Sequence, residues 1–190
     1  NHISNLIGQL NIKVYQKLYN VVLPVELQKG ACLIVMGSEG RNEQIIKTDQ
    51  DNALVVKDGI DVEQYRPYMN EITKHLIDFG YPPCEGNIMV SNPFWCKNVK
   101  EYKSETARWI EAPDMQNYMD LAIFFDSFAV AGNKELLINL KDDLFHKLHD
   151  KDVFMAYFAK ATLTFDTPNT IANFMTKSHN IDIKKAAVFP

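Results

Sequence analysis

Residues 31–56, ACLIVMGSEGRNEQIIKTDQDNALVV, decide the fold class that this sequence predicts. The stretch opens with a short apolar run, 31–36, between Gly30 and Gly37, which has the length and the boundaries of a buried strand. A second apolar run lies at 53–56 and ends at a turn sequence. We therefore predict two strands of one domain, joined by a polar segment whose side chains can do chemistry.

Helical patterns flank these strands along the chain. Apolar residues recur at three- and four-residue steps through 3–22, which is typical of an amphipathic helix. After the second strand, similar patterns predict one helix over 62–79, interrupted at Pro67, and another over 100–111. Helices on both sides of strands favour the α/β (α+β) class, a sheet with flanking helices.

The rest of the chain predicts a loop, a third strand and a helical end. Residues 80–98 are punctuated by Gly and Pro, so we expect a loop with a brief strand at 88–90. The mixed aromatic and aliphatic run 121–130 predicts a third strand, and leucine stripes at helical spacing follow it. The change in composition divides the chain into an α/β domain over 1–132 and an incomplete helical domain over 133–190.

Composition excludes several classes of protein. Of the 190 residues, 46% are hydrophobic and 23% are charged, a balance typical of a globular domain. The 20 basic and 24 acidic side chains give a net charge of −4, so we do not expect a broad basic surface for nonspecific nucleic-acid binding. No apolar run approaches the roughly 20 residues that cross a bilayer.

The cysteines and the first residue bear on where the protein resides. Cys32, Cys84 and Cys96 leave one sulfur over in any disulfide scheme and form no CxxC pair. A reduced, cytoplasmic protein is the simplest interpretation. Because the chain opens at Asn1 without a methionine and stops within a helical pattern, we expect it to be part of a longer protein.

The chemistry lies in the polar segment between the first two strands. Asp49 and Asp51 are two residues apart, and on an extended chain such side chains point the same way. Two converging carboxylates suit Mg²⁺, which completes its coordination with water and substrate phosphates. Gly37 allows the backbone to approach a phosphate, and Ser38 offers a hydroxyl and an N–H group. Alone, Asp-x-Asp predicts a solvated turn or a helix cap, and Gly-Ser a turn; their order between two apolar runs favours a metal-phosphate site.

Other candidate sites are weaker. His146 and His149 are spaced to share a metal on a helix, but no third ligand accompanies them and we expect a solvated pair. Cys84 and Cys96 lie in the Gly- and Pro-rich loop without a histidine pattern, so we expect both to serve packing. Trp95, in the same loop, is expected to anchor it rather than to stack on a base.

One family resembles this constellation. Gly37-Ser38, ten further residues and then Asp49-x-Asp51 resemble the signature of the polymerase-β-type nucleotidyltransferase superfamily. The longer string GSEGRNEQIIKTDQDNAL resembles one branch of it, the signal-transduction nucleotidyltransferase domain, similar to bacterial PII-protein uridylyltransferase and glutamine-synthetase adenylyltransferase. A looser resemblance extends through 80–89 and through Phe124-Phe125-Asp126. Members often follow a cyclic-nucleotide-binding or CBS domain, so the resemblance implies such a partner domain upstream.

The resemblance implies a nucleotidyltransferase-like mixed sheet that holds two Mg²⁺ ions, or Mn²⁺, on three carboxylates. Asp49 and Asp51 match the first two. Asp126, expected on the third strand, matches the third, with Asp120 as the competitor. The related transferases carry arginines after that aspartate, whereas residues 127–130 contain none.

The same resemblance implies transfer of a nucleoside monophosphate from ATP or UTP to a protein or small acceptor in a signalling context. The two ions, about 4 Å apart, would activate the acceptor hydroxyl and stabilise the leaving pyrophosphate. The residues expected to bind the nucleotide are Gly37, Ser38, Arg41, Gln44, Lys47 and Thr48. The absence of the arginines leaves an alternative, a nucleotide-sensing or interaction module that binds without turnover.

Overall fold

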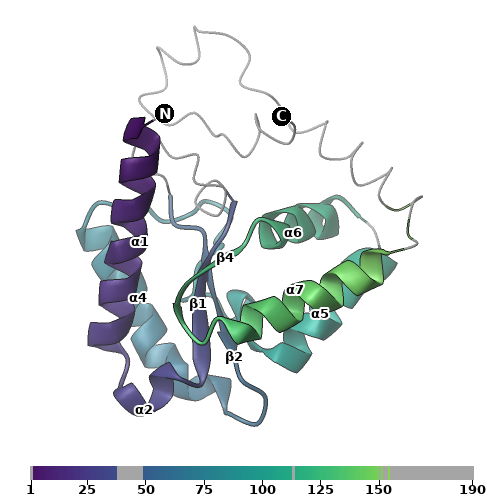
Figure 1. Ribbon diagram of the computed structural model, residues 1–190, viewed down its shortest axis with the longest axis horizontal. Coiled ribbons are helices and arrows are strands. Elements are labelled where there is room, and N and C mark those ends of the chain that lie inside the picture. The colour runs from purple at the N-terminus through teal and green to yellow at the C-terminus, as the bar shows by residue number, and fades with distance from the viewer. Residues whose placement is uncertain (1, 38–48, 113, 150, 152–153, 155–190) are drawn as a thin grey trace, which may run out of the picture.

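The centre of the molecule is a four-stranded mixed sheet in the order β3-β2-β1-β4. Figure 1 labels three of these strands, β1, β2 and β4. The computed structural model describes residues 2–37, 49–112, 114–149, 151 and 154. The strands are β1 (Ala31–Val35), β2 (Asn52–Val56), β3 (Cys96–Asn98) and β4 (Phe128–Gly132). β1 pairs antiparallel with β2 and with β4, whereas β3 runs parallel to β2. The predicted α/β class and the first two predicted strands are confirmed.

Helices cover both faces of this sheet (Figure 1). On one face lie α1 (His2–Val22) and α4 (Arg66–Asp78). On the other lie α5 (Val99–Glu111), α6 (Met115–Phe125) and α7 (Glu135–Leu148). The short helical segments are α2 (Val25–Gln28), η1 (Val62–Tyr65) and η2 (Pro93–Trp95). None of the helices within the described ranges is both long and apolar enough to cross a membrane.

β1 is apolar throughout because both of its faces are buried. Cys32 and Ile34 pack in the core cluster that includes α5, α6 and α7. Leu33 and Val35 pack in the cluster that includes α1 and α4. Successive side chains of a strand point to opposite faces, so a strand covered on both sides needs apolar residues at every position. This is why a continuous apolar run predicted the strand correctly.

The helices predicted over 3–22, 62–79 and 100–111 are confirmed, and the first leucine stripe of the predicted helical end forms α7. The second stripe, at 153–163, lies outside the described residues except for residue 154. Local signals set where the helices begin. Pro67 does not interrupt a helix but lies in the first turn of α4, where its missing N–H costs nothing. α5 begins with a reciprocal cap: Asn98 Oδ1 accepts from the Glu101 N–H at 2.9 Å, and Glu101 Oε2 accepts from the Asn98 N–H at 2.8 Å.

The strand predicted over 121–130 is wrong for most of its length. Residues up to Phe125 belong to α6, and the strand β4 begins only at Phe128. The carboxylate of Asp114 caps the helix by accepting the Asn117 N–H at 2.8 Å. Leu121 and its helical neighbours are buried at helical spacing. The run of apolar residues fits the period of a strand as well as that of a helix. The cap at Asp114, upstream of the run, favours the helix.

The brief strand predicted at 88–90 is also wrong, and the strand that follows it was missed. Residues 88–90 do not form a strand, although two of them bond to Asn52: its N–H donates to the Ile88 carbonyl at 3.0 Å, and its Oδ1 accepts from the Val90 N–H at 2.9 Å. The actual strand is β3, of sequence CKN. Three residues of this polarity give no apolar run, so periodicity could not indicate it.

Candidate metal centre

Two strands meet the end of β1 at one edge of the sheet. Val35 pairs with Asn52 of β2 on one side and with Phe128 of β4 on the other. Asp51 directly precedes Asn52, and its carbonyl accepts a hydrogen bond from the Met36 N–H at 2.9 Å. The ladder therefore continues one residue beyond the strands and fixes the backbone of Asp51 beside the end of β1.

Gly37 lies two residues beyond the end of β1 at this edge. Its φ of 58° lies in the left-handed region, which glycine adopts without the steric cost that a Cβ brings. This glycine-favouring conformation therefore comes one residue after Met36, whose N–H bonds to the Asp51 carbonyl. The other residues predicted to bind the nucleotide, Ser38, Arg41, Gln44, Lys47 and Thr48, lie outside the described residues.

Three side chains that could ligate a metal ion converge at this edge of the sheet. The ligand atoms of Asp49, Asp51 and Cys84 all lie within 4.8 Å of one another. Asp51 is only 1% exposed, Asp49 is partly buried and Cys84 is buried. The two carboxylates thus come together as the alternation of an extended chain predicts, and a thiol from the loop after α4 joins them.

The thiol of Cys84 acts as a donor toward this group. Burial raises its pKa, and the charge and the hydrogen bond of Asp49 raise it further, against backbone hydrogen bonds at Ile88 and Gly86 that lower it. The thiol therefore keeps its proton at neutral pH, and its S–H group is placed to donate to the carboxylate of Asp49.

The residues between and after the two aspartates hold the loop that carries Cys84. Gln50 donates its backbone N–H to the Pro82 carbonyl at 3.0 Å and its Nε2 to the Tyr81 carbonyl at 3.1 Å. Asn52 binds the same loop through Ile88 and Val90, as described above. Because side chains alternate along the extended chain, Asp49 and Asp51 are left to face the centre while Gln50 and Asn52 fix the loop against it.

Asp126 does not lie on a strand, contrary to the sequence prediction. It is the residue that ends α6, two positions before the start of β4. It is not a member of the group formed by Asp49, Asp51 and Cys84. The pairing of Phe128 with Val35 nevertheless brings the segment of Asp126 to the edge of the sheet at which Asp51 lies.

Asp120, the competing third carboxylate, lies within α6 and faces different neighbours. It is 5% exposed and accepts a hydrogen bond from Gln116 Nε2 at 2.9 Å. Burial raises its pKa, and the charged groups that act on it are Arg108, Glu105 and Asp114. None of these belongs to the group around Asp49.

The donor set fits a divalent cation. Carboxylate oxygens are the hard ligands that Mg²⁺ and Mn²⁺ prefer, whereas a thiol adds affinity for softer ions such as Zn²⁺. Asp49 and Asp51 can hold the first kind of ion without help from sulfur. Because Cys84 is within reach, the same site can also hold a softer ion such as Zn²⁺.

The comparison with protein families adds the decisive observation. Residues 1–116 match the family described as Putative nucleotidyltransferase DUF294. The chain belongs to this family. In this DUF294 member the match includes Asp49, Asp51 and Cys84 and ends before Asp126. Neither the comparison with curated proteins nor that with solved structures finds a match.

Cys84 is the residue that sequence reasoning misplaced. The sequence predicts only a packing role for it, because it lies in a Gly- and Pro-rich loop without a histidine pattern, and the aspartates are 33 residues or more away along the chain. The sole signal was the loose resemblance at 80–89. Cys96 and Trp95 do pack as predicted: both are buried, and the Trp95 ring lies 6.2 Å from that of Trp109.

Proposed function

We propose that this DUF294 protein is a Mg²⁺- or Mn²⁺-dependent nucleotidyltransferase. It would transfer a nucleoside monophosphate from ATP or UTP to a protein or small acceptor in a signalling context. One observation carries the proposal: in a member of a nucleotidyltransferase family, Asp49 and Asp51 converge at the end of a sheet, beside the turn at Gly37. Nucleotidyl transfer needs anionic ligands for a divalent ion at such a phosphate-accessible turn.

The proposed roles follow from the position of each residue. Asp49 and Asp51 hold the metal, and Asp126 contributes the third carboxylate and receives the proton of the acceptor hydroxyl. We choose Asp126 over Asp120 because its segment leads into β4 at the edge of the sheet where Asp51 lies. The bound ion supplies positive charge that activates the acceptor hydroxyl and neutralises the phosphates.

The remaining residues are proposed to hold the nucleotide. Gly37 lets the backbone approach the phosphates, since no Cβ stands in the way. Arg41 would bind phosphate oxygens as a bidentate fork and Lys47 as a point charge, and neutral groups would support them. These neutral residues are Ser38, Gln44 and Thr48.

The biological setting is proposed from the resemblance. The chain would act like the PII-protein uridylyltransferase and glutamine-synthetase adenylyltransferase branch, downstream of a cyclic-nucleotide-binding or CBS domain. Its three cysteines are free and buried, which agrees with a reducing cytoplasm.

The test is a transfer assay with matched variants. The protein is incubated with α-labelled ATP or UTP, Mg²⁺ or Mn²⁺ and cell extract, and label should move to a protein or small-molecule acceptor. Asp49→Asn and Asp51→Asn should abolish transfer and metal-dependent nucleotide binding with little change in the melting temperature. Asp78→Asn, an exposed aspartate at the end of α4, serves as the control and should behave as wild type. Unchanged nucleotide binding in both Asn variants would overturn the assignment.

A second function competes because residues 127–130 lack the arginines of the related transferases. A nucleotide-sensing module would keep the aspartates and bind nucleotide without turnover. The same assay separates the two. Metal-dependent binding that needs Asp49 and Asp51, with no label transferred to any acceptor, would favour the sensor.

A further inference from the structure

Lys141 of α7 lies against the segment that carries Asp126. Its Nζ donates to the Phe125 carbonyl at 3.1 Å and to the Ser127 carbonyl at 2.6 Å. These carbonyls belong to the residues immediately before and after Asp126. One side chain from α7 therefore bonds to the carbonyls of both residues that flank this aspartate.

The position suits an ammonium group for two physical reasons. The last carbonyls of α6 have no partner within the helix, and the negative end of the helix dipole lies there, so a cation is favourable. Burial lowers the pKa of Lys141, while the charge of Asp126 raises it. The ammonium thus lies within the field of the Asp126 carboxylate.

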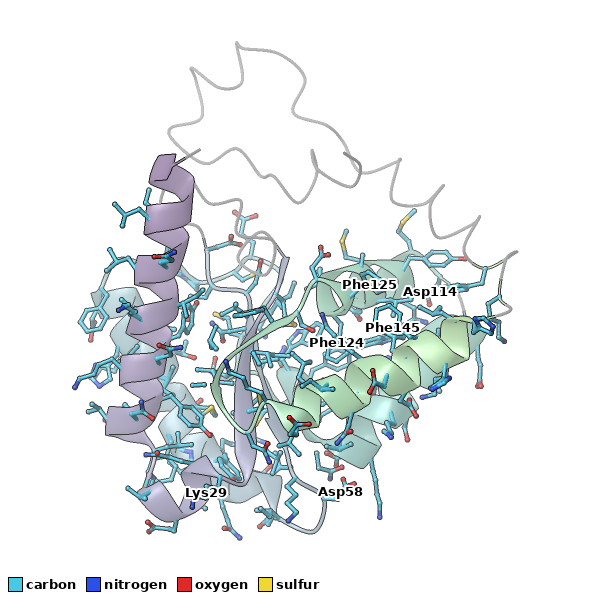
Figure 2. The ribbon with its side chains drawn as sticks, viewed as in Figure 1. Lys29, Asp58, Asp114, Phe124, Phe125 and Phe145 are labelled. Atoms are coloured by element: carbon cyan, nitrogen blue, oxygen red, sulfur yellow. The ribbon has the colours of Figure 1, made fainter. Side chains whose placement is uncertain are left out.

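A second contact holds the same faces of α6 and α7 together. The rings of Phe125 and Phe145 meet edge to face, with their centroids 5.5 Å apart (Figure 2). Phe145 follows Lys141 by one helical turn, so both residues lie on one side of α7. The contact between Phe125 and Phe145 therefore helps to hold Lys141 against the segment of Asp126.

The register of the sheet connects this arrangement to the candidate metal centre. Phe128 and Asn52 both pair with Val35, from opposite sides of β1. Asp126 comes two residues before Phe128, and Asp51 comes one residue before Asn52. Both aspartates therefore approach the same edge of the sheet.

We propose that Lys141 is a positioning residue that holds Asp126 toward the metal set by Asp49 and Asp51, and that it supplies the positive charge absent from 127–130. The inference rests on the proposed function, since it takes Asp126 as the third carboxylate. It also makes α7 a part of the nucleotidyltransferase unit, although α7 lies beyond the part of the chain that matches the family.

The test measures Mn²⁺ binding to the full 190-residue chain by the loss of the free-ion electron paramagnetic resonance signal. Lys141→Met should weaken Mn²⁺ binding about tenfold, the scale seen when an outer partner of a metal ligand is lost. Lys141→Arg, which keeps the charge and the donors, should restore most of the affinity. Asp126→Asn should weaken binding at least as much, and adding Lys141→Met to it should have no further effect.

The control is Lys147→Met on the same helix. Lys147 is also partly buried and also donates to a backbone carbonyl, that of Lys103 at 2.7 Å. The Lys147→Met variant should lower the melting temperature but leave Mn²⁺ affinity unchanged. A loss of Mn²⁺ affinity in Lys141→Met would then come from the position of Asp126 and not from lower stability of the fold. If Lys141→Met misfolds, Lys141→Gln replaces it, since it keeps a donor without the charge.

The outcomes separate this inference from the proposed function. Wild-type Mn²⁺ affinity in folded Lys141→Met, alongside weakened Asp126→Asn, would overturn the inference and leave the proposed function standing. Wild-type affinity in Asp126→Asn would also overturn it, because Lys141 would then have no ligand to position. Wild-type affinity in Asp49→Asn and Asp51→Asn would overturn the proposed function itself.

Discussion

Cys84 gives the candidate metal centre a donor that two carboxylates do not have. Its sulfur lies within 4.8 Å of ligand oxygens of Asp49 and Asp51. Its S–H group can donate to Asp49, and we expect a hard ion such as Mg²⁺ to leave the thiol protonated. We expect a softer ion to bind the thiolate directly, because affinity for sulfur rises from Mn²⁺ toward Zn²⁺ and Cd²⁺.

Cys84→Ser should therefore change metal preference. We expect it to weaken Cd²⁺ binding by about tenfold or more and to leave Mg²⁺ binding nearly unchanged. The ultraviolet charge-transfer band of a cadmium–thiolate bond, followed during titration of the protein with Cd²⁺ alone, reports on the sulfur directly. Cys96→Ser is the matched control, since this buried thiol lies in β3 and outside the group. A band of wild-type strength in Cys84→Ser would show that another residue provides the sulfur.

At the scale of elements, α5 and α7 are joined by an ion pair as well as by the core, and a second pair within α7 shares its carboxylate. Lys103 Nζ of α5 lies 3.4 Å from Asp143 Oδ1 of α7, and Lys147 Nζ lies 2.6 Å from Asp143 Oδ2. Burial raises the pKa of Asp143, but the hydrogen bond and charge of Lys147 and the charge of Lys103 outweigh it, so the pKa is lowered below its usual value of 3.8. The folded state therefore binds this proton less readily than the unfolded chain.

This shift predicts how stability depends on pH. A carboxyl with a lowered pKa stabilises the folded state above its unfolded pKa, and the contribution is lost as pH falls through the lower, folded value. Asp143→Asn should reduce the free energy of unfolding near neutral pH by no more than about 1 kcal/mol, the range for partly exposed pairs. The difference from wild type should shrink as acid protonates Asp143.

Urea unfolding midpoints from about pH 6 down to about pH 3 check this expectation. Asp142→Asn, an exposed neighbour on α7, should follow the wild-type profile. A difference between Asp143→Asn and wild type that grows on acidification would contradict the assigned sign.

The elements also show which part of the fold was predictable. β1 was found from the sequence because burial on two faces demands a continuous apolar run, and Gly residues bound it. The sequence predicts a strand over 121–130 because the apolar residues there, which include the second half of α6, fit the periods of both a helix and a strand, and the prediction does not use the cap at Asp114. β3 carried no apolar signal at all, because two of its three residues are Lys97 and Asn98.

The same physics explains the site. Asp49 and Asp51 could be paired from sequence because two residues on one extended segment face the same way. Cys84 could not, because its place depends on hydrogen bonds that Gln50 and Asn52 make to a distant loop. The contacts of Lys141 could not be predicted either, because they depend on how α7 packs over the end of α6. Hydrophobic periodicity carries no information about such packing.

At the scale of the whole molecule, α7 completes one face of the sheet. Its buried leucines belong to the same core cluster as Cys32 and Ile34 of β1 and Val55 of β2. These leucines are Leu136, Leu137, Leu140 and Leu144. The division of the chain after residue 132 remains a prediction, and the packing of α7 supplies a way to test it.

A chain ending at residue 132 should lose native packing, because removal of α7 uncovers the apolar face formed by β1 and β2. It should bind a hydrophobic dye and lose its near-ultraviolet circular dichroism, whereas the 190-residue chain should do neither. Two variants of the full chain localise the effect. Leu140→Ala, at a side chain 1% exposed, should cost about 2–5 kcal/mol of unfolding free energy, and Ile138→Ala, 48% exposed, less than about 0.5 kcal/mol. Cooperative unfolding of the 1–132 chain with native circular dichroism would instead establish the boundary after residue 132, and α7 would then belong to a separate unit.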